Sequence, residues 1–470
     1  HQITPHGRAA LKMFKYNLFI SLIICSSIVN SADICAKGNG CVCRDNSKVS
    51  DDYLGEHVDC SYYKGNIVTA DYALPGRVYS LDLSSSNISE LQPSRIFESN
   101  TLVKLFINYN QIREIQPRIL KLPELKWLEL SNNELEFIDK DVFTDINKLE
   151  YLNLANNKFI SYEKLSLHHL GNLNELVLNN NNLGPVMERA NLFDRNAFGV
   201  THKIKSLSIS GINLNVVPDN FFSDVYDLRK LIISNNNLKD IFEVPYTLEY
   251  LDLSDNPIEE MSSEDFNDLL ALKELKLNNL NIKEVPEFIF SSLHSLQSLQ
   301  LERNKNLTVF SSLAFGREVL DDADDFVLES LSLKGSRLTK LEEDLAEPFG
   351  QLTSLDLQGN PFQCDCDIKW LKTLQIDPEN YEHLRCGSPK TLFNAKIFEL
   401  DSKYFTCSPK LNDRHIGLVI AGVAFCMILA GIALWFFVFI PRYQSKGHCI
   451  SNVEYSAAAY TMLPVHRTDS

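Results

Sequence analysis

The sequence predicts an α/β solenoid with a parallel β-sheet on its concave face, short helices and loops on its convex face, and a single transmembrane helix. Three observations support this fold class. An apolar pattern recurs between Val78 and Phe362, mostly at intervals of 23 or 24 residues. Cysteines gather on both sides of this segment, and the stretch from Ile416 to Ile440 contains no charged residue. We therefore expect one elongated extracellular body followed by a membrane anchor.

The first residues predict an export signal. Met13 is interpreted as the initiating residue, so residues 1–12 are expected to be non-native. Residues 13–32 have a short positive region and an apolar run that ends in small residues, which is typical of a signal peptide. The alternative, a buried core helix, would require a domain to begin with an apolar run that has no polar face. We expect the following residues to be exported.

The cysteines agree with this layout. Of the eleven cysteines, Cys25 lies in the predicted signal, Cys426 in the apolar stretch and Cys449 beyond it. The remaining eight lie in the exported segment. An even number of cysteines in an oxidising compartment predicts disulfides.

The formal net charge of −16 bears on the class of partner. An acidic surface binds nucleic acid poorly and favours basic partners, so we expect no nucleic-acid ligand. The alternative is that the charge only maintains solubility.

The repeat is clearest around residue 130, where Leu125, Leu128, Leu130, Asn133 and Leu135 mark its apolar and asparagine positions. Taking the first apolar residue of each unit, residues 78–360 contain twelve repeats. They begin at Val78, Leu102, Leu125, Leu149, Leu173, Ile204, Leu228, Leu248, Leu272, Leu296, Leu328 and Leu352. The intervals after Leu173 and Leu296 are longer and the interval after Leu228 is shorter, so we expect the extra residues to lie on loops.

The spacing predicts a short strand in each repeat. Leu128 and Leu130 alternate with Trp127 and Glu129, so the leucines point inward and the other two outward. The asparagine can pair with backbone groups of adjacent turns that would otherwise be buried without partners. Eight repeats carry it, at Asn110, Asn133, Asn157, Asn181, Asn236, Asn256, Asn304 and Asn360. The other four have Ser86, Ile212, Leu280 and Ser336, so we expect an interrupted ladder.

A second apolar column is expected to fill the convex side. It contains five phenylalanines: Phe97, Phe143, Phe222, Phe266 and Phe290. We interpret them as core residues without a functional role.

Residues 35–407 resemble an extracellular leucine-rich-repeat domain, with a repeat length in that family's range. Residues 33–77 resemble its cysteine-rich N-terminal cap. Residues 361–407, with Cys364-Asp365-Cys366 and Trp370-Leu371, resemble its C-terminal cap. The chain is similar to insect-type adhesion and receptor proteins with a bare repeat ectodomain, so we expect neither immunoglobulin nor Toll-type signalling domains.

The resemblance implies a disulfide pairing for each cap. It joins Cys35 to Cys43, Cys41 to Cys60, Cys364 to Cys386, and Cys366 to Cys407. The residues alone allow three pairings for each set of four cysteines. Zinc binding is the alternative for such cysteine pairs, and export disfavours it.

Residues 416–440 predict a transmembrane helix, because a bilayer core of about 30 Å requires about 20 helical residues. The signal peptide places the ectodomain outside and residues 441–470 in the cytoplasm, at the plasma membrane. In this tail, Tyr460 and Leu463 have the spacing of an endocytic sorting motif, and Cys449 is a candidate for palmitoylation.

The concave sheet is the expected binding surface, because large side chains are predicted to face outward there. These candidates for protein binding are Phe106, Trp127, Tyr151, Val177, Ile232 and Tyr250. Exposed aromatic groups favour interfaces, and we expect the first three to anchor a protein ligand. The alternative is that aromatic side chains on neighbouring strands stabilise the sheet or lie beneath a glycan.

Two further features concern the exported surface. Asn87 and Asn306 begin N-glycosylation sequons. The insert from Glu318 to Asp325 carries four aspartates, which could bind calcium or a basic ligand. A solvated acidic loop is the alternative interpretation.

No catalytic motif, cofactor site or metal site is expected, since the sequence has no phosphate-binding loop, nucleophile elbow or paired histidines at ligand spacing. Two functions remain open. One is adhesion through a protein on another cell, which includes homophilic contact. The other is a receptor or accessory subunit that captures a soluble ligand, including a microbial one, or modulates another membrane protein. The fold alone does not choose between them.

Overall fold

The computed structural model describes residues 32–45, 55–194, 196–321, 326–407, 413–435 and 437. They fall into two compact units, one ending at Thr406 and the other starting at Cys407. Nearly all of the predicted signal peptide and the whole tail from residue 441 lie outside the described residues.

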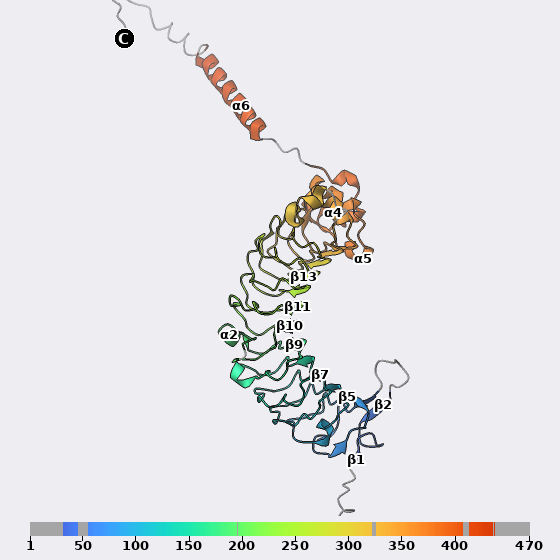
Figure 1. Cartoon of the computed structure of the whole chain (residues 1–470). Coiled ribbons are helices and arrows are strands. Elements are labelled where there is room, and N and C mark those ends of the chain that lie inside the picture. Colours follow the sequence, from blue (N-terminus) through green and yellow to red (C-terminus); the bar gives the residue numbers. More distant parts are fainter. Residues whose placement is uncertain are drawn as a thin grey trace, which may run out of the picture. The chain divides into compact units, whose positions relative to one another are not determined.

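The first unit is a solenoid organised around one 14-stranded sheet. Twelve of its strands follow one another in parallel, and each carries a buried leucine, such as Leu128 in β7. These strands are β5 (Val78–Asp82), β6 (Lys104–Phe106), β7 (Trp127–Glu129), β8 (Tyr151–Asn153), β9 (Glu175–Val177), β10 (Ser206–Ser208), β11 (Lys230–Ile232), β12 (Tyr250–Asp252), β13 (Glu274–Lys276), β15 (Ser298–Gln300), β17 (Ser330–Ser332) and β18 (Ser354–Asp356). Figure 1 shows the sheet on the inner side of the arc and α2 (Gly184–Met187) on the outer side. The predicted solenoid with a concave parallel sheet is confirmed.

The convex side consists mainly of turns and very short helices. The longer interval after Leu173 contains α2, and the longer interval after Leu296 contains η3 (Ser312–Phe315) and α3 (Glu318–Asp321). The other short elements are η1 (Arg95–Phe97), η2 (Tyr162–Lys164), η5 (Glu343–Leu345) and α4 (Ala346–Gly350), with the strand pair β14 (Glu284–Val285) and β16 (Val309–Phe310). Extra residues therefore leave the register of the sheet unchanged.

Additional elements cover the first turn. β2 (Val42–Asp45) pairs antiparallel with β3 (Glu56–Asp59), and β3 continues the sheet in parallel with β5. β1 (Ala32–Asp33) pairs with β4 (Tyr72–Ala73). This arrangement protects the apolar face of the first repeat from water.

The last turn is covered in a similar way. β19 (Phe362–Gln363) pairs with β20 (Cys386–Ser388), and η6 (Cys366–Thr373) places Trp370 over the core with 5% of its surface exposed. The indole Nε1 of Trp370 donates to the carbonyl of Leu341 at 3.4 Å. The remaining elements of this region are α5 (Pro378–Tyr381), η7 (Lys390–Leu392), η8 (Ile397–Glu399) and η9 (Ser402–Tyr404).

The asparagine ladder connects successive turns. The side-chain amide of Asn157 donates to the carbonyls of Leu130 and Leu154 at 3.0 Å each, and its Oδ1 accepts from the backbone of Leu135 at 3.0 Å. Each ladder asparagine thus pairs with its own turn and the preceding one. At the two apolar positions, Ile212 and Leu280, the side chains are buried in the core instead.

The residue before each ladder position has a left-handed backbone in all twelve turns, and asparagine or glycine, which tolerate this conformation, occupies eight of them. At Gly211 the φ angle is +65°, and an added Cβ would lie 2.2 Å from Oδ1 of Asn180. This turn therefore requires glycine for both its backbone angle and its close contact.

The five phenylalanines of the convex column are all buried. The ring of Phe266 stacks on that of Phe290 with centroids 6.2 Å apart, and Phe290 contacts Phe315 at 5.6 Å. The prediction that this column belongs to the core agrees with its burial.

The second unit contains α6 (Asp413–Leu434), which covers most of the predicted transmembrane segment. Within the described part of the chain, no helix has both the length and the hydropathy needed to cross a membrane.

Candidate functional site

The concave sheet presents two rows of outward side chains, because each short strand turns its central leucine inward. The strand register assigns the six predicted binding residues to these rows. Trp127, Tyr151 and Tyr250 lie in the row formed by the first strand residues. Phe106, Val177 and Ile232 lie in the row formed by the third. All six are half-buried, so each keeps part of its surface open to a partner.

Trp127 and Tyr151 form a closely stacked aromatic pair on this face. Their rings stack with centroids 3.5 Å apart and planes 10° from parallel. The Nζ atom of Lys104 lies 5.5 Å from the Trp127 ring, within the range of a cation–π contact. The indole Nε1 is buried and meets no acceptor among the described residues, so the exposed part of the ring is apolar.

The hydroxyl of Tyr151 is held by its neighbours. It donates to Oε2 of Glu129 at 3.4 Å, and the same oxygen accepts from the Asn153 side chain at 3.1 Å. Burial raises the pKa of Tyr151 well above its usual value, and the nearby carboxylates of Glu129 and Glu175 raise it further. The hydroxyl therefore stays protonated and acts as a donor.

The second row is less continuous. Phe106 faces Glu129 across the strand pair and does not stack on another aromatic ring among the described contacts. Val177 and Ile232 flank Ser208, whose hydroxyl donates to Oδ1 of Asn179 at 2.8 Å. The structure therefore brings together Trp127 and Tyr151, while Val177 and Ile232 belong to a separate part of the face.

Tyr250 lies between two lysines. The Nζ atoms of Lys230 and Lys276 are 5.0 Å and 5.3 Å from its ring centroid. Burial is the main cause that raises the pKa of Tyr250. Lys276 is also 3.1 Å from Glu274.

The lysines beside the aromatic rings were missed when the sequence was considered alone. Lys104, Lys230 and Lys276 occupy outward strand positions, so the strand register itself was the signal that could have identified them. The concave face thus combines aromatic groups with cations, a composition that is common at protein interfaces.

The cap cysteines come together in pairs. Disulfides join Cys35 to Cys43, Cys41 to Cys60 and Cys364 to Cys386. Cys366 and Cys407 are each in the disulfide-bonded state.

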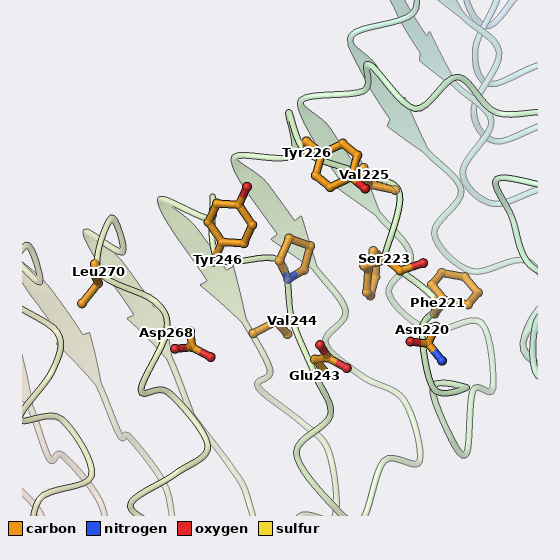
Figure 2. Close-up of a pocket in the computed structure, with 12 residues that line it drawn as sticks. Asn220, Phe221, Ser223, Val225, Tyr226, Glu243, Val244, Tyr246, Asp268 and Leu270 are labelled. Atoms are coloured by element: carbon orange, nitrogen blue, oxygen red, sulfur yellow. The ribbon is translucent and has the colours of Figure 1, made fainter.

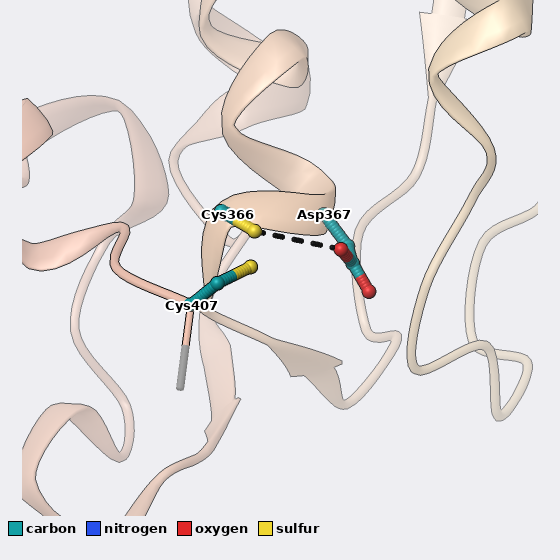
Figure 3. A group of neighbouring side chains, drawn as sticks. All are labelled: Cys366, Asp367 and Cys407. Carbon is teal, nitrogen blue, oxygen red and sulfur yellow. Dashed lines mark hydrogen bonds between the residues drawn. The ribbon is translucent and has the colours of Figure 1, made fainter. Parts of the chain in front are cut away.

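Figure 3 shows Cys366 and Asp367 at the start of η6, where the Asp367 carboxylate lies 3.5 Å from the Cys366 sulfur. Sulfur in a disulfide is not the thiolate that binds a metal, so disulfide bonding of Cys366 disfavours the alternative of zinc binding there.

Both sequon asparagines, Asn87 and Asn306, are exposed. The described part of the acidic insert is α3, and residues 322–325 lie outside the described residues. The sorting motif at Tyr460 and Leu463 lies outside them as well, as does Cys449.

Comparisons with known proteins identify the repeated segments as leucine-rich repeats. The family model described as "Leucine rich repeat" matches residues 76–135, 123–183 and 246–305. Toll-like receptor 7 of Mus musculus is 26% identical over 444 residues, which cover 86% of this chain and 39% of that protein. Tsukushi of Gallus gallus is 28% identical over 70% of this chain and 80% of that protein. Chaoptin of Tribolium castaneum is 27% identical over 65% of this chain and 40% of that protein.

The chain thus spans only about two fifths of the length of Toll-like receptor 7 and of chaoptin. Among solved structures, the leucine-rich repeat domain of APL1B is 18% identical, with a TM-score of 0.47 over 80% of this chain and 93% of that one.

Proposed function

We propose that this chain, whose repeats match the leucine-rich-repeat model and which is similar to Toll-like receptor 7 and chaoptin, binds an extracellular protein through its concave face at the cell surface. The observation that carries the proposal is the half-buried stack of Trp127 on Tyr151, bordered by Lys104. Interfaces are enriched in such rigid aromatic groups, which lose little conformational entropy on binding.

A stack of this kind also stabilises a sheet, so the two roles must be separated. If the stack served only to stabilise the sheet, we would expect the rest of the protein to cover both rings. Trp127 and Tyr151 instead retain exposed apolar surface, with Phe106 on the neighbouring strand β6. This composition supports Phe106, Trp127 and Tyr151 as the anchors, with Val177, Ile232 and Tyr250 as outer contacts.

The sequence supports placement at the plasma membrane. The proposed signal peptide at residues 13–32 exports the chain, and residues 416–440 anchor it through one uncharged stretch. The short tail then contains the proposed sorting motif at Tyr460 and Leu463. The proposed glycans on Asn87 and Asn306 would lie on the exported side.

Two roles fit this arrangement. In adhesion, the concave face binds a protein on another cell or a second copy of the chain. In the alternative role, it captures a soluble ligand or acts as an accessory subunit in the same membrane. The similarity to Toll-like receptor 7 supports the alternative role, and neither role involves catalysis.

A mixed-cell assay tests the proposal. Full-length protein is displayed on non-adherent cells, which are mixed with differently labelled non-expressing cells, and clustering is measured. We expect clusters that depend on expression, since adhesion requires binding between cells. Clusters of expressing cells alone would indicate homophilic contact, and mixed clusters a heterophilic partner. An absence of clusters would contradict adhesion and favour the receptor role.

A further inference from the structure

A second exposed apolar feature lies at the edge of the solenoid, away from the rows of the concave sheet. Tyr226, Tyr246 and Leu270 have 59%, 61% and 57% of their surfaces exposed. Each lies four residues before the strand of its turn, at β11, β12 and β13. Figure 2 shows them on the loops that lead into successive strands. They are therefore neighbours in one column of equivalent positions.

In the other turns, most of the equivalent positions hold small or polar residues. Eight of the nine remaining equivalent positions hold glycine, proline, asparagine or histidine: Gly76, Asn100, Pro123, Asn147, Gly171, His202, His294 and Gly350. The ninth, Phe326, packs against the core beside Phe315. In this column, solvent-exposed large apolar groups thus occur in three consecutive turns, and adjacent exposed groups of this kind are uncommon without a partner.

The same three turns line a partly open cavity of about 530 Å³. It arises at the short repeat between Leu228 and Leu248, which has 20 residues where the next repeat has 24. The shorter outer segment leaves space beside the buried side chains of Phe221, Phe222 and Val225. The volume is in the range of sites that accept a small molecule or a protruding side chain.

The charged side chains that line the cavity are all acidic. Glu243 and Asp268 line it and are exposed, while no lysine, arginine or histidine is among its described lining residues. Neither carboxylate forms a salt bridge in the described part of the chain, whereas many other surface acids do. Two unpaired carboxylates beside an apolar hollow favour an occupant that is both apolar and cationic.

We propose that this cavity and its rim form a second docking site, for a protein segment in which an aromatic or aliphatic side chain neighbours a lysine or arginine. The apolar side chain enters the hollow between Tyr226 and Tyr246. The basic group pairs with Glu243 and Asp268. The site lies on the loops before β11, β12 and β13, whereas the stacked pair Trp127 and Tyr151 lies on β7 and β8.

Peptide selection tests this site and requires no assumption about the identity of the natural partner. Purified full-length protein is panned against a phage-displayed library of random peptides, with counter-selection on the Tyr226→Ser/Tyr246→Ser/Leu270→Ser variant. These side chains are exposed, so the variant is expected to fold, which its circular dichroism and thermal unfolding will check. We expect enriched peptides to contain an apolar residue next to lysine or arginine.

Affinity measurements complete the test with one enriched peptide made synthetically. We expect Glu243→Gln/Asp268→Asn and added salt each to weaken binding by roughly tenfold, as for a close charge pair. The concave variant Trp127→Ser/Tyr151→Ser should bind it unchanged, which separates this site from the proposed function. Three results would overturn the proposal: equal recovery on wild type and variant, enrichment of acidic or uncharged peptides, or self-association of the wild type through this rim.

Discussion

Replacing Phe143 with alanine is expected to lower the free energy of unfolding by about 4 kcal/mol. Phe143 is fully buried in the convex column, and its removal leaves a cavity that neighbouring turns cannot close. The loss combines the transfer free energy of the ring with the lost packing contacts. Urea denaturation of the full-length protein, followed by circular dichroism, measures it.

Phe137 provides the control within the same repeat, because 41% of its surface is exposed. We expect Phe137→Ala to change the free energy of unfolding by less than about 1 kcal/mol, as is usual for surface positions. If the two substitutions had equal effects, the convex column would not be the core that we describe.

The second large effect is expected at the ladder. Replacing Asn157 with leucine should cost about 2 to 3 kcal/mol, because the backbone N–H of Leu135 loses its acceptor and two buried carbonyls each lose a donor. The carbonyls of Leu130 and Leu154 keep one donor each, from Asn133 and Asn181, which limits the damage. The same denaturation experiment measures this change.

Asn147→Leu is the matched control, because Asn147 is exposed and lies at the end of the preceding repeat. A cost for Asn157→Leu no greater than for this control would show that the ladder contributes little. The natural leucine at position 280 indicates why one interruption is tolerated. The carbonyls of Leu253 and Leu277, to which an asparagine at 280 would donate, still accept from Asn256 and Asn304 respectively.

The strand positions could be predicted closely from the sequence. Every strand of the twelve consecutive turns includes the residue two places after the first apolar position of its repeat, as Trp127 follows Leu125. This succeeds because leucine burial and asparagine pairing act locally and recur in each turn. The disulfide pairing could not be predicted from spacing in this way. Spacing alone allowed three pairings for each cap, and only the resemblance selected one of them.

The organisation of the concave face could not be predicted as well. Phe106 was grouped with Trp127 and Tyr151 because all three follow one another along the repeats. The register places Phe106 opposite Glu129, and only Trp127 and Tyr151 share a row. The lysines at 104, 230 and 276 gain their importance only from ring contacts across strands, which a single repeat does not reveal.

The cavity at the short repeat was also outside the reach of sequence reasoning. The shortened interval after Leu228 was evident, but its consequence depends on how two longer neighbours pack around it. A missing segment can be absorbed by closer packing or can leave a hollow. Here it leaves a hollow, because Phe221 and Phe222 stay buried and line the space without filling it.

The central claim, that the concave face binds a protein partner, is tested most directly by Phe106→Ser/Trp127→Ser/Tyr151→Ser in the mixed-cell assay. Wild type, this variant and the control Gln300→Ser, which changes an outward residue on the distant strand β15, are compared at equal surface levels. We predict that wild type and the control form clusters and that the triple variant forms no more than non-expressing cells. Clustering by a correctly folded triple variant at the level of wild type would contradict the account.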